Sequence, residues 1–308
     1  FIVKLNPYVR PTIASFSPIR GPVGTVVTIT GTKFDPTPTN NMVYFGATRA
    51  VVTAATFTQL SVVVPTGATF EPISVTVSGG TAFSKRPFLV TFPNGGLINT
   101  CSFEPVVGIG TGVQGYGPAI GDLDGDGKPD AAVPDYVNGM VRVYKNTSTV
   151  GSLTASSFAP SLDLPTGLNP QFAEIAEIDG DGKLDLIVTN YNSNTLSILR
   201  NTSSPGTISF APKVDLATNI GPYQIATGDL NGDGRTDIAI SNANSGGVSI
   251  WENSGFSGSI TTTSFKPKFD IPMASQWVIA ISDLDQDGKA DLISGPALST
   301  TLTLFRNI

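Results

Sequence analysis

The sequence has no histidine, a single cysteine and only 14% charged residues in 308. Without histidine there can be no Ser-His or Cys-His nucleophile pair, no zinc site of the H-E-x-x-H type and no imidazole base, so only carboxylate-based catalysis stays open. The single Cys101 cannot form an internal disulfide, which fits either a cytosolic protein or an exported one that lacks disulfides. The chain begins with Phe1 rather than Met, so we expect its natural start to lie upstream.

The sequence also lacks long apolar runs and an excess of basic residues. No run approaches the roughly 18 residues of a membrane-spanning helix, so we expect no transmembrane segment. The net charge of -6 and the pI near 4.6 argue against a nucleic-acid partner, which would favour a basic protein. The length predicts about two domains of roughly 150 residues each.

A nine-residue pattern occurs four times, with starts 55, 52 and 54 residues apart. An Asn follows 24 residues after the start of every copy and closes an alternating apolar strand, and an S-F pair lies 19 or 20 residues upstream. The four copies are D-L-D-G-D-G-K-P-D (122–130), E-I-D-G-D-G-K-L-D (177–185), D-L-N-G-D-G-R-T-D (229–237) and D-L-D-Q-D-G-K-A-D (283–291).

Each repeat contains short apolar runs separated by turn residues, without a helical period. Four strands in about 54 residues, repeated in tandem, are typical of β-propeller blades. If the S-F strand is the outer strand of the preceding blade, the segment 102–108 could complete the last blade. The sequence leaves open whether four blades close a ring or belong to a longer array.

The first 92 residues do not share this period. Strand-like runs at 11–31, 42–45, 60–64, 73–77 and 88–92 predict a small antiparallel Ig-like β-sandwich. We therefore expect an all-β chain, with the sandwich at 1–92, a linker at 93–99 and four four-stranded blades at 100–308.

The acidic loops have the spacing of a calcium site. Residues at positions 1, 3 and 5 can converge on one ion, the Gly at position 6 allows the turn, position 7 offers a backbone carbonyl and position 9 closes the shell. Asp and Gly are common in simple turns as well, but four copies in register favour up to four Ca²⁺ ions. The predicted ligands are Asp122, Asp124, Asp126, Lys128, Asp130, Glu177, Asp179, Asp181, Lys183, Asp185, Asp229, Asn231, Asp233, Arg235, Asp237, Asp283, Asp285, Asp287, Lys289 and Asp291.

These loops hold 15 of the 24 acidic residues, so the low pI records metal sites more than an acidic surface. We expect the ions to fix turns between strands rather than to contact a ligand. Sites of this kind fill at extracellular calcium concentrations, which favours a secreted or cell-surface protein.

The loops and the apolar strands after them, D-A-A-V (130–133), D-L-I-V (185–188), D-I-A-I (237–240) and D-L-I-S (291–294), resemble FG-GAP/VCBS repeats, which are similar to the integrin α-subunit propeller. The segments P-T-I-A-S-F-S-P (11–18), G-P-V-G-T-V-V-T-I-T-G (21–31) and V-Y-F-G (43–46) resemble an IPT/TIG domain, which has an Ig-like fold. This resemblance implies a bacterial surface protein for adhesion or ligand display, rather than catalysis.

One residue per repeat lies six positions before each loop and could line a ligand rim: Tyr116, Gln171, Tyr223 and Trp277. Packing between blades is the alternative role for these side chains. Our main hypothesis is a non-catalytic, calcium-binding extracellular module with a protein or glycan ligand. The alternatives are a lectin-like propeller and a hydrolase or lyase that would use the acids outside the loops, Glu104, Asp135, Glu174 and Glu252.

Overall fold

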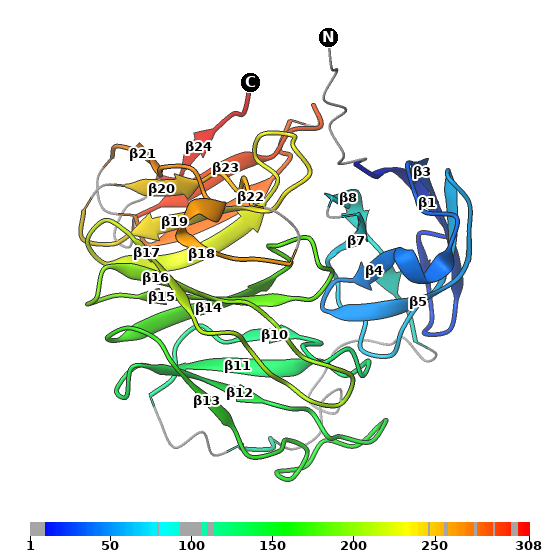
Figure 1. Ribbon diagram of the computed structural model, residues 1–308, viewed down its shortest axis with the longest axis horizontal. Coiled ribbons are helices and arrows are strands. Elements are labelled where there is room, and N and C mark those ends of the chain that lie inside the picture. The colour runs from blue at the N-terminus through cyan, green and yellow to red at the C-terminus, as the bar shows by residue number, and fades with distance from the viewer. Residues whose placement is uncertain are drawn as a thin grey trace.

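A computed structural model describes residues 10–78, 80–92, 106–109, 114–245, 247–255, 258–273, 276–285, 287–296 and 301–308. Figure 1 shows an N-terminal β-domain (blue) beside a stack of antiparallel sheets that runs from green to red. Among the described residues the only helices are two short 3-10 turns, η1 (Pro38–Asn40) and η2 (Thr262–Ser264). The all-β prediction is confirmed. In this part of the chain no helix is long and apolar enough to cross a bilayer.

The N-terminal domain is built on one seven-stranded sheet, in the order β1-β3-β6-β5-β4-β7-β8. The first half of β5 pairs with β4 and its second half pairs with β6. Alternating residues from both halves, among them Ile29, Phe45, Leu60 and Ile73, form one buried core. The strands are β1 (Thr12–Ser17), β2 (Arg20–Gly21), β3 (Val26–Thr32), β4 (Met42–Phe45), β5 (Thr48–Ala55), β6 (Gln59–Val63), β7 (Pro72–Val77), β8 (Gly80–Pro87) and β9 (Leu89–Val90).

The sequence patterns located β4, β6 and β7 closely but did not single out β5 or β8. The run predicted at 88–92 is only the two-residue β9, which pairs in parallel with β2. Polar residues occupy half of β8, and in β5 Thr and Arg residues alternate irregularly with Ala and Val, so neither strand shows a regular apolar alternation. The predicted linker at 93–99 lies outside the described residues.

Three repeats form four-stranded sheets, and the fourth shows three strands among its described residues. The outer strand of each complete sheet follows the S-F segment of the next repeat, as predicted. The strands are β10 (Ala119–Gly121), β11 (Asp130–Asp135), β12 (Met140–Tyr144) and β13 (Leu162–Pro165); β14 (Pro170–Ala176), β15 (Asp185–Asn190), β16 (Thr195–Leu199) and β17 (Val214–Ala217); β18 (Pro222–Gly228), β19 (Asp237–Asn242), β20 (Val248–Trp251) and β21 (Phe269–Ile271); and β22 (Val278–Ser282), β23 (Asp291–Gly295) and β24 (Thr303–Phe305).

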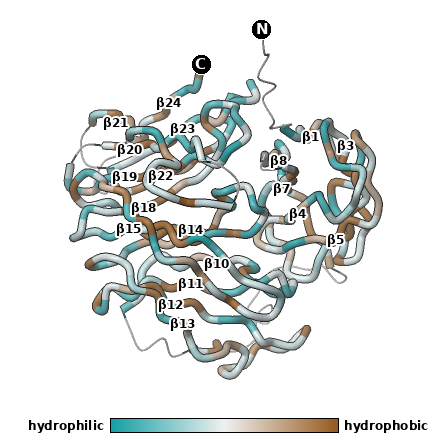
Figure 2. The backbone as a smooth tube through the Cα atoms, in the orientation of Figure 1, coloured by the Kyte–Doolittle hydropathy of each residue, from teal (hydrophilic) through white to brown (hydrophobic). Residues whose placement is uncertain are grey.

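Strands in the middle of the stack are apolar on both faces because a sheet packs on each side. In β15, Leu186 and Val188 pack toward the first repeat, whereas Ile187 packs toward the third. Figure 2 shows apolar (brown) stretches in the middle of the stack. The D-L-I-V type of run therefore marks a strand buried between two repeats.

The ends of the stack are less complete. Residues 102–105 of the strand expected to complete the last blade lie outside the described part, and residues 106–108 are exposed and belong to no strand. Leu302 and Leu304 on the last sheet are 65% and 63% exposed, whereas their equivalents in the third repeat, Val248 and Ile250, are buried and partly buried against the fourth repeat. In Figure 1 the sheets of repeats one and four lie at opposite ends of the stack, so the described residues form an open array.

Candidate metal centres

Each acidic loop joins the inner strand of a sheet to its second strand. The position 6 glycines adopt left-handed conformations, with φ +87° at Gly127, +81° at Gly182, +75° at Gly234 and +91° at Gly288. This region favours glycine, which explains why the pattern requires it there. The turn brings acids that are up to eight residues apart onto one centre.

Carboxylate oxygens from positions 1, 3 and 9 lie within 4.8 Å of one another in three loops. These groups are Asp122, Asp124 and Asp130; Glu177, Asp179 and Asp185; and Asp283, Asp285 and Asp291. The acids at position 5 lie outside these groups. Asp126 Oδ1, for example, accepts a hydrogen bond from the Lys128 N–H at 3.0 Å. Ligation through position 5 and through the carbonyls of position 7 stays a prediction.

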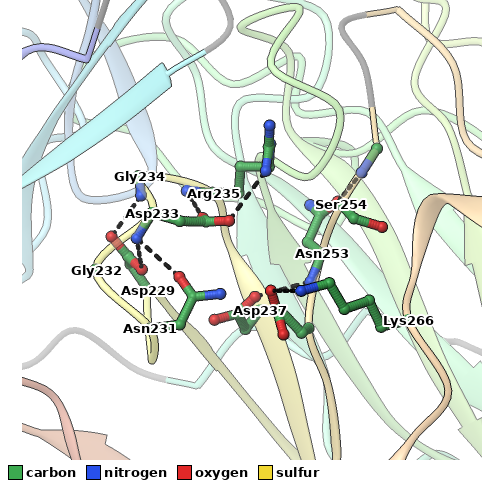
Figure 3. Close-up of polar contacts among 12 residues, drawn as sticks. Asp229, Asn231, Gly232, Asp233, Gly234, Arg235, Asp237, Asn253, Ser254 and Lys266 are labelled. Carbon is green, nitrogen blue, oxygen red and sulfur yellow. Dashed lines mark hydrogen bonds and ion pairs between the residues drawn. The ribbon is translucent and has the colours of Figure 1, made fainter. Parts of the chain in front are cut away.

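The third loop differs because Asn231 replaces an acid. Among the described residues, the carboxylate oxygens of its three acids do not all lie within 4.8 Å of one another. The Asp233 N–H instead donates to Asn231 Oδ1 at 2.8 Å and to Asp229 Oδ1 at 2.9 Å, and Asp237 accepts from the Asn253 N–H at 2.8 Å (Figure 3). We expect this loop to have the lowest calcium affinity of the four because it offers the fewest carboxylates.

An ion fits these loops on two further grounds. Oδ1 of Asp122 and Oδ1 of Asp283 are buried without a hydrogen-bond partner, which is costly unless a cation faces them. Burial, followed by the charges of the neighbouring acids, raises the pKa of Asp122 to about 6 and that of Asp130 to about 7. Burial also raises the pKa of Glu177 to about 8 and that of Asp185 well above its usual value. These carboxylates need a cation to stay ionised together at neutral pH.

The Asn that ends each repeat connects the loop to the rest of the stack. The Asn201 N–H donates to Asp185 Oδ1 at 2.8 Å, and its Nδ2 donates at 2.8 Å both to Leu184 O and to Leu123 O of the previous loop. Asn253 and Asn307 make the same link to the carbonyls of Ile178 and Leu230. The fixed 24-residue interval therefore positions one side chain that joins consecutive loops.

Sequence reasoning missed a basic residue one position before this Asn. Lys145 pairs with Asp124, Arg200 Nε lies 3.0 Å from Asp179 Oδ2, and Arg306 pairs with Asp285. Each base lies 21 residues after the position 3 acid, an interval that could have been read from the repeats. The third repeat has Glu252 at this place, and Arg235 pairs with Asp233 instead. The bases offset part of the negative charge in each loop.

The predicted ligand rim lies at the other end of the inner strands, away from the loops. Tyr223 packs at 4.8 Å between ring centroids against Trp277 and at 4.9 Å against Phe172. Tyr116 is 40% exposed and packs on Tyr136. We call Tyr116, Tyr136, Phe172, Tyr191, Tyr223 and Trp277 the aromatic row. Gln171 is buried, and Phe172 provides the aromatic ring of the second repeat.

The acids outside the loops have local partners. Asp135 accepts hydrogen bonds from Asn138 and forms an ion pair with Arg142, and Glu252 pairs with Lys266. Glu104 lies outside the described residues. These contacts give Asp135 and Glu252 structural roles.

Glu174 is a partly buried acid that contacts Thr227 of the next repeat, and it predicts a pH effect. Burial, followed by the charge of Glu71, raises its pKa from 4.5 to about 7. Its contribution to stability is therefore fully present below about pH 4.5 and is lost as the pH rises through 7. With calcium saturating, Glu174→Gln should flatten the pH dependence of the free energy of unfolding and raise that energy at pH 8 by about 3 kcal/mol. Urea unfolding from pH 5 to 8 measures this, with Glu252→Gln, a partly exposed acid, as the control. Parallel profiles for Glu174→Gln and wild type would contradict it.

Comparison with known proteins agrees with this architecture. The FG-GAP-like repeat model matches residues 177–240 and 229–294, and the IPT/TIG domain model matches residues 11–92. The first loop, at 122–130, lies outside these matches, although it brings together acids at the same positions. No curated protein gives a significant match to the sequence.

Several solved structures are similar over most of their length at low identity. An auxiliary nutrient binding protein from Bacteroides thetaiotaomicron VPI-5482 is 11% identical with a TM-score of 0.26, covering 94% of this chain and 96% of its own. One from Bacteroides ovatus ATCC 8483 is 12% identical with a TM-score of 0.26 and the same coverage. A "Putative phosphatase" from Bacteroides thetaiotaomicron VPI-5482 is 13% identical with a TM-score of 0.31, covering 97% and 84%. These scores assign neither a ligand nor an activity to this chain.

The family models, the seven-stranded N-terminal sheet and the repeated loop-and-sheet units agree. The chain therefore contains an N-terminal IPT/TIG domain followed by FG-GAP-like repeats.

Proposed function

We propose that this protein is a non-catalytic, calcium-stabilised binding module that acts outside the cell, secreted or on a bacterial surface, in adhesion or ligand binding. The observation that carries the proposal is the recurring cluster of position 1, 3 and 9 carboxylates, with a buried, unpartnered oxygen in the first and fourth loops. Oxygen-only, carboxylate-rich ligation suits calcium, whereas zinc and copper favour nitrogen or sulfur.

The ions have a structural role in this proposal. Every loop is a connection between two strands of one sheet, and its position 9 acid accepts a hydrogen bond from the Asn that ends the repeat. In the second, third and fourth repeats this Asn also binds the previous loop. An ion that fixes the loop therefore also fixes the contact between repeats. Extracellular calcium, at about 1 mM, fills sites with dissociation constants near 0.1 mM, whereas cytosolic calcium does not.

A catalytic role has less support. The sequence lacks histidine, and Asp135 and Glu252 are held by ion pairs. The charge of Glu71 raises the pKa of Glu174, but Glu174 is partly buried and contacts Thr227 of the next repeat. A hydrolase or lyase would need two carboxyl groups that face a substrate in one cleft.

Substitution of a position 9 acid tests the calcium proposal. Asp130→Asn should reduce the calcium stoichiometry, measured by isothermal titration calorimetry, by one ion per chain because Asp130 is an acid of the first cluster. Asp135→Asn is the matched control, because this nearby buried acid pairs with Arg142 and belongs to no loop. An unchanged stoichiometry in Asp130→Asn would argue against metal binding by this loop.

The aromatic row supports a second candidate function, a lectin-like module. It crosses all four repeats at the end of the stack opposite the loops, and aromatic rings stack on the apolar faces of sugars. A glycan array should lose its signal in Trp277→Ala but keep it in Phe57→Ala, whose ring is 67% exposed on the other domain. No signal from the wild type would leave a protein ligand as the alternative.

A further inference from the structure

The N-terminal domain lies against the loop ends of the repeats. Figure 1 shows β4, β5 and β7 facing the ends of the stacked sheets. The Asp122 N–H of the first loop donates to Ala47 O at 2.9 Å, and the Thr81 N–H of β8 donates to Gly234 O of the third loop at 2.9 Å. Backbone groups of two different loops are thus satisfied by the other domain.

The second loop has the most extensive contact. Tyr44 Oη donates to Gly182 O at 3.0 Å, and Thr81 Oγ1 donates to Glu177 Oε2 at 3.1 Å. The side chain of Met42 covers Gly182, where an added Cβ would lie 1.7 Å from the Met42 sulfur. A ligand carboxylate and the turn glycine beside it are therefore held directly by the N-terminal domain.

Apolar contact joins the same elements. Tyr44 is 4% exposed and belongs to the hydrophobic cluster that contains Leu123 of the first loop and Leu184 of the second. These leucines lie between the metal-ligating positions of their loops, so a change in loop conformation moves them. The packing of the N-terminal domain thus depends on the shape of the loops.

The fourth loop lies outside this interface. Asp285, Asp287 and Gly288 are exposed, and among the described residues no hydrogen bond joins residues 283–291 to the N-terminal domain. The repeats therefore contain three covered loops and one open loop with the same sequence pattern. This difference supplies an internal control.

We propose that the IPT/TIG domain forms the outer wall of the first three metal sites, so that calcium binding by these loops and docking of the domain stabilise each other, while the fourth loop binds calcium independently. This inference rests on the proposed calcium function. Without a cation the carboxylates repel one another, and the turns that direct Gly182 O and Gly234 O toward the domain lose their support. Linkage then requires the docked domain to raise calcium affinity by the same factor.

Amide hydrogen exchange on the full chain tests the coupling. Chelation should accelerate exchange at Thr81, which is not part of a metal loop, by at least about tenfold, because its hydrogen bond crosses the interface. The Val62 amide in the core of the N-terminal domain should not change. The Leu284 N–H, which donates to Asp291 Oδ2 at 2.9 Å, reports on the fourth loop itself.

Two equivalent substitutions separate the covered and open loops. Asp229 and Asp283 both stand at position 1, in the third and fourth loops respectively. Asp229→Asn should accelerate exchange at Thr81, whereas Asp283→Asn should accelerate exchange at Leu284 only. Equal effects of the two variants on Thr81 would overturn the proposal.

The reciprocal effect is measured by calorimetry. Thr81→Val removes the hydroxyl that contacts Glu177 and should weaken one calcium site by about tenfold. Thr53→Val is the matched control, because it removes an exposed hydrogen bond to Ser61 O in the same domain. Superimposable isotherms for the two variants would contradict the coupling.

The outcomes also separate this inference from the calcium function. If calcium produces no heat of binding and leaves Leu284 exchange unchanged, the proposed function fails. If calcium binds and slows Leu284 exchange but leaves Thr81 exchange unchanged, only the coupling fails.

Discussion

Removal of calcium should lower the melting temperature of this protein by roughly 10 to 20 °C. Four sites with dissociation constants near 0.1 mM, at 1 mM free calcium, contribute about 1.4 kcal/mol each, or about 6 kcal/mol together. In a domain of this size about 1 kcal/mol moves the melting temperature by 2 to 4 °C. Scanning calorimetry in 1 mM CaCl₂ and in excess EGTA measures the difference.

Magnesium at the same ionic strength is the control. It requires near-octahedral geometry and loses its water reluctantly, so it should recover only a small part of the stability. A melting temperature that differs by less than about 2 °C between calcium and EGTA would contradict the structural role of the ions.

The second large effect is expected at the Asn that joins consecutive repeats. Asn201→Ala should destabilise the protein by about 4 kcal/mol, measured by urea unfolding in saturating calcium. Asn201 is 0% exposed. Its Nδ2 donates to Leu184 O and Leu123 O, and its Oδ1 accepts from the Ser203 N–H. The substitution leaves three buried backbone groups unpaired, each of which costs about 1 to 3 kcal/mol.

Asn146 provides a control at the equivalent position of the first repeat. Its Nδ2 donates to Pro129 O and its Oδ1 accepts from the Ser148 N–H, and among the described residues it makes no hydrogen bond to an earlier loop. Asn146→Ala should therefore cost about 1 to 2 kcal/mol less than Asn201→Ala. Equal losses would mean that the contact with Leu123 O does not stabilise the stack.

Much of this architecture could be predicted from the sequence because it depends on local, repeated signals. The acidic loops need Gly at a left-handed turn, and strands buried between two sheets carry unbroken apolar runs such as L-I-V in β15 and I-A-I in β19. The constant interval between loop and Asn is a geometric requirement, since the Asn N–H contacts the position 9 acid in all four repeats. The position of the S-F segment also predicts that the outer strand of each sheet comes from the next repeat in the chain.

The contact between the domains could not be predicted in the same way. It uses backbone groups, such as Ala47 O and the Thr81 N–H, which carry no sequence signal. Tyr44 is part of the V-Y-F-G segment and follows the alternation of a strand, so nothing in its sequence context distinguishes an interface tyrosine from a core residue. In the second repeat the rim position is occupied by Gln171, and the aromatic ring that packs on Tyr223 belongs to the next residue, Phe172. A role of these positions in ligand binding stays a prediction.

Anomalous scattering from a crystal grown in millimolar calcium tests the central claim most directly. The account predicts a calcium peak in each of the four loops, between the carboxylates of positions 1, 3 and 9, with oxygen ligands at about 2.3 to 2.6 Å. The absence of a peak from all four loops at that calcium concentration would contradict it.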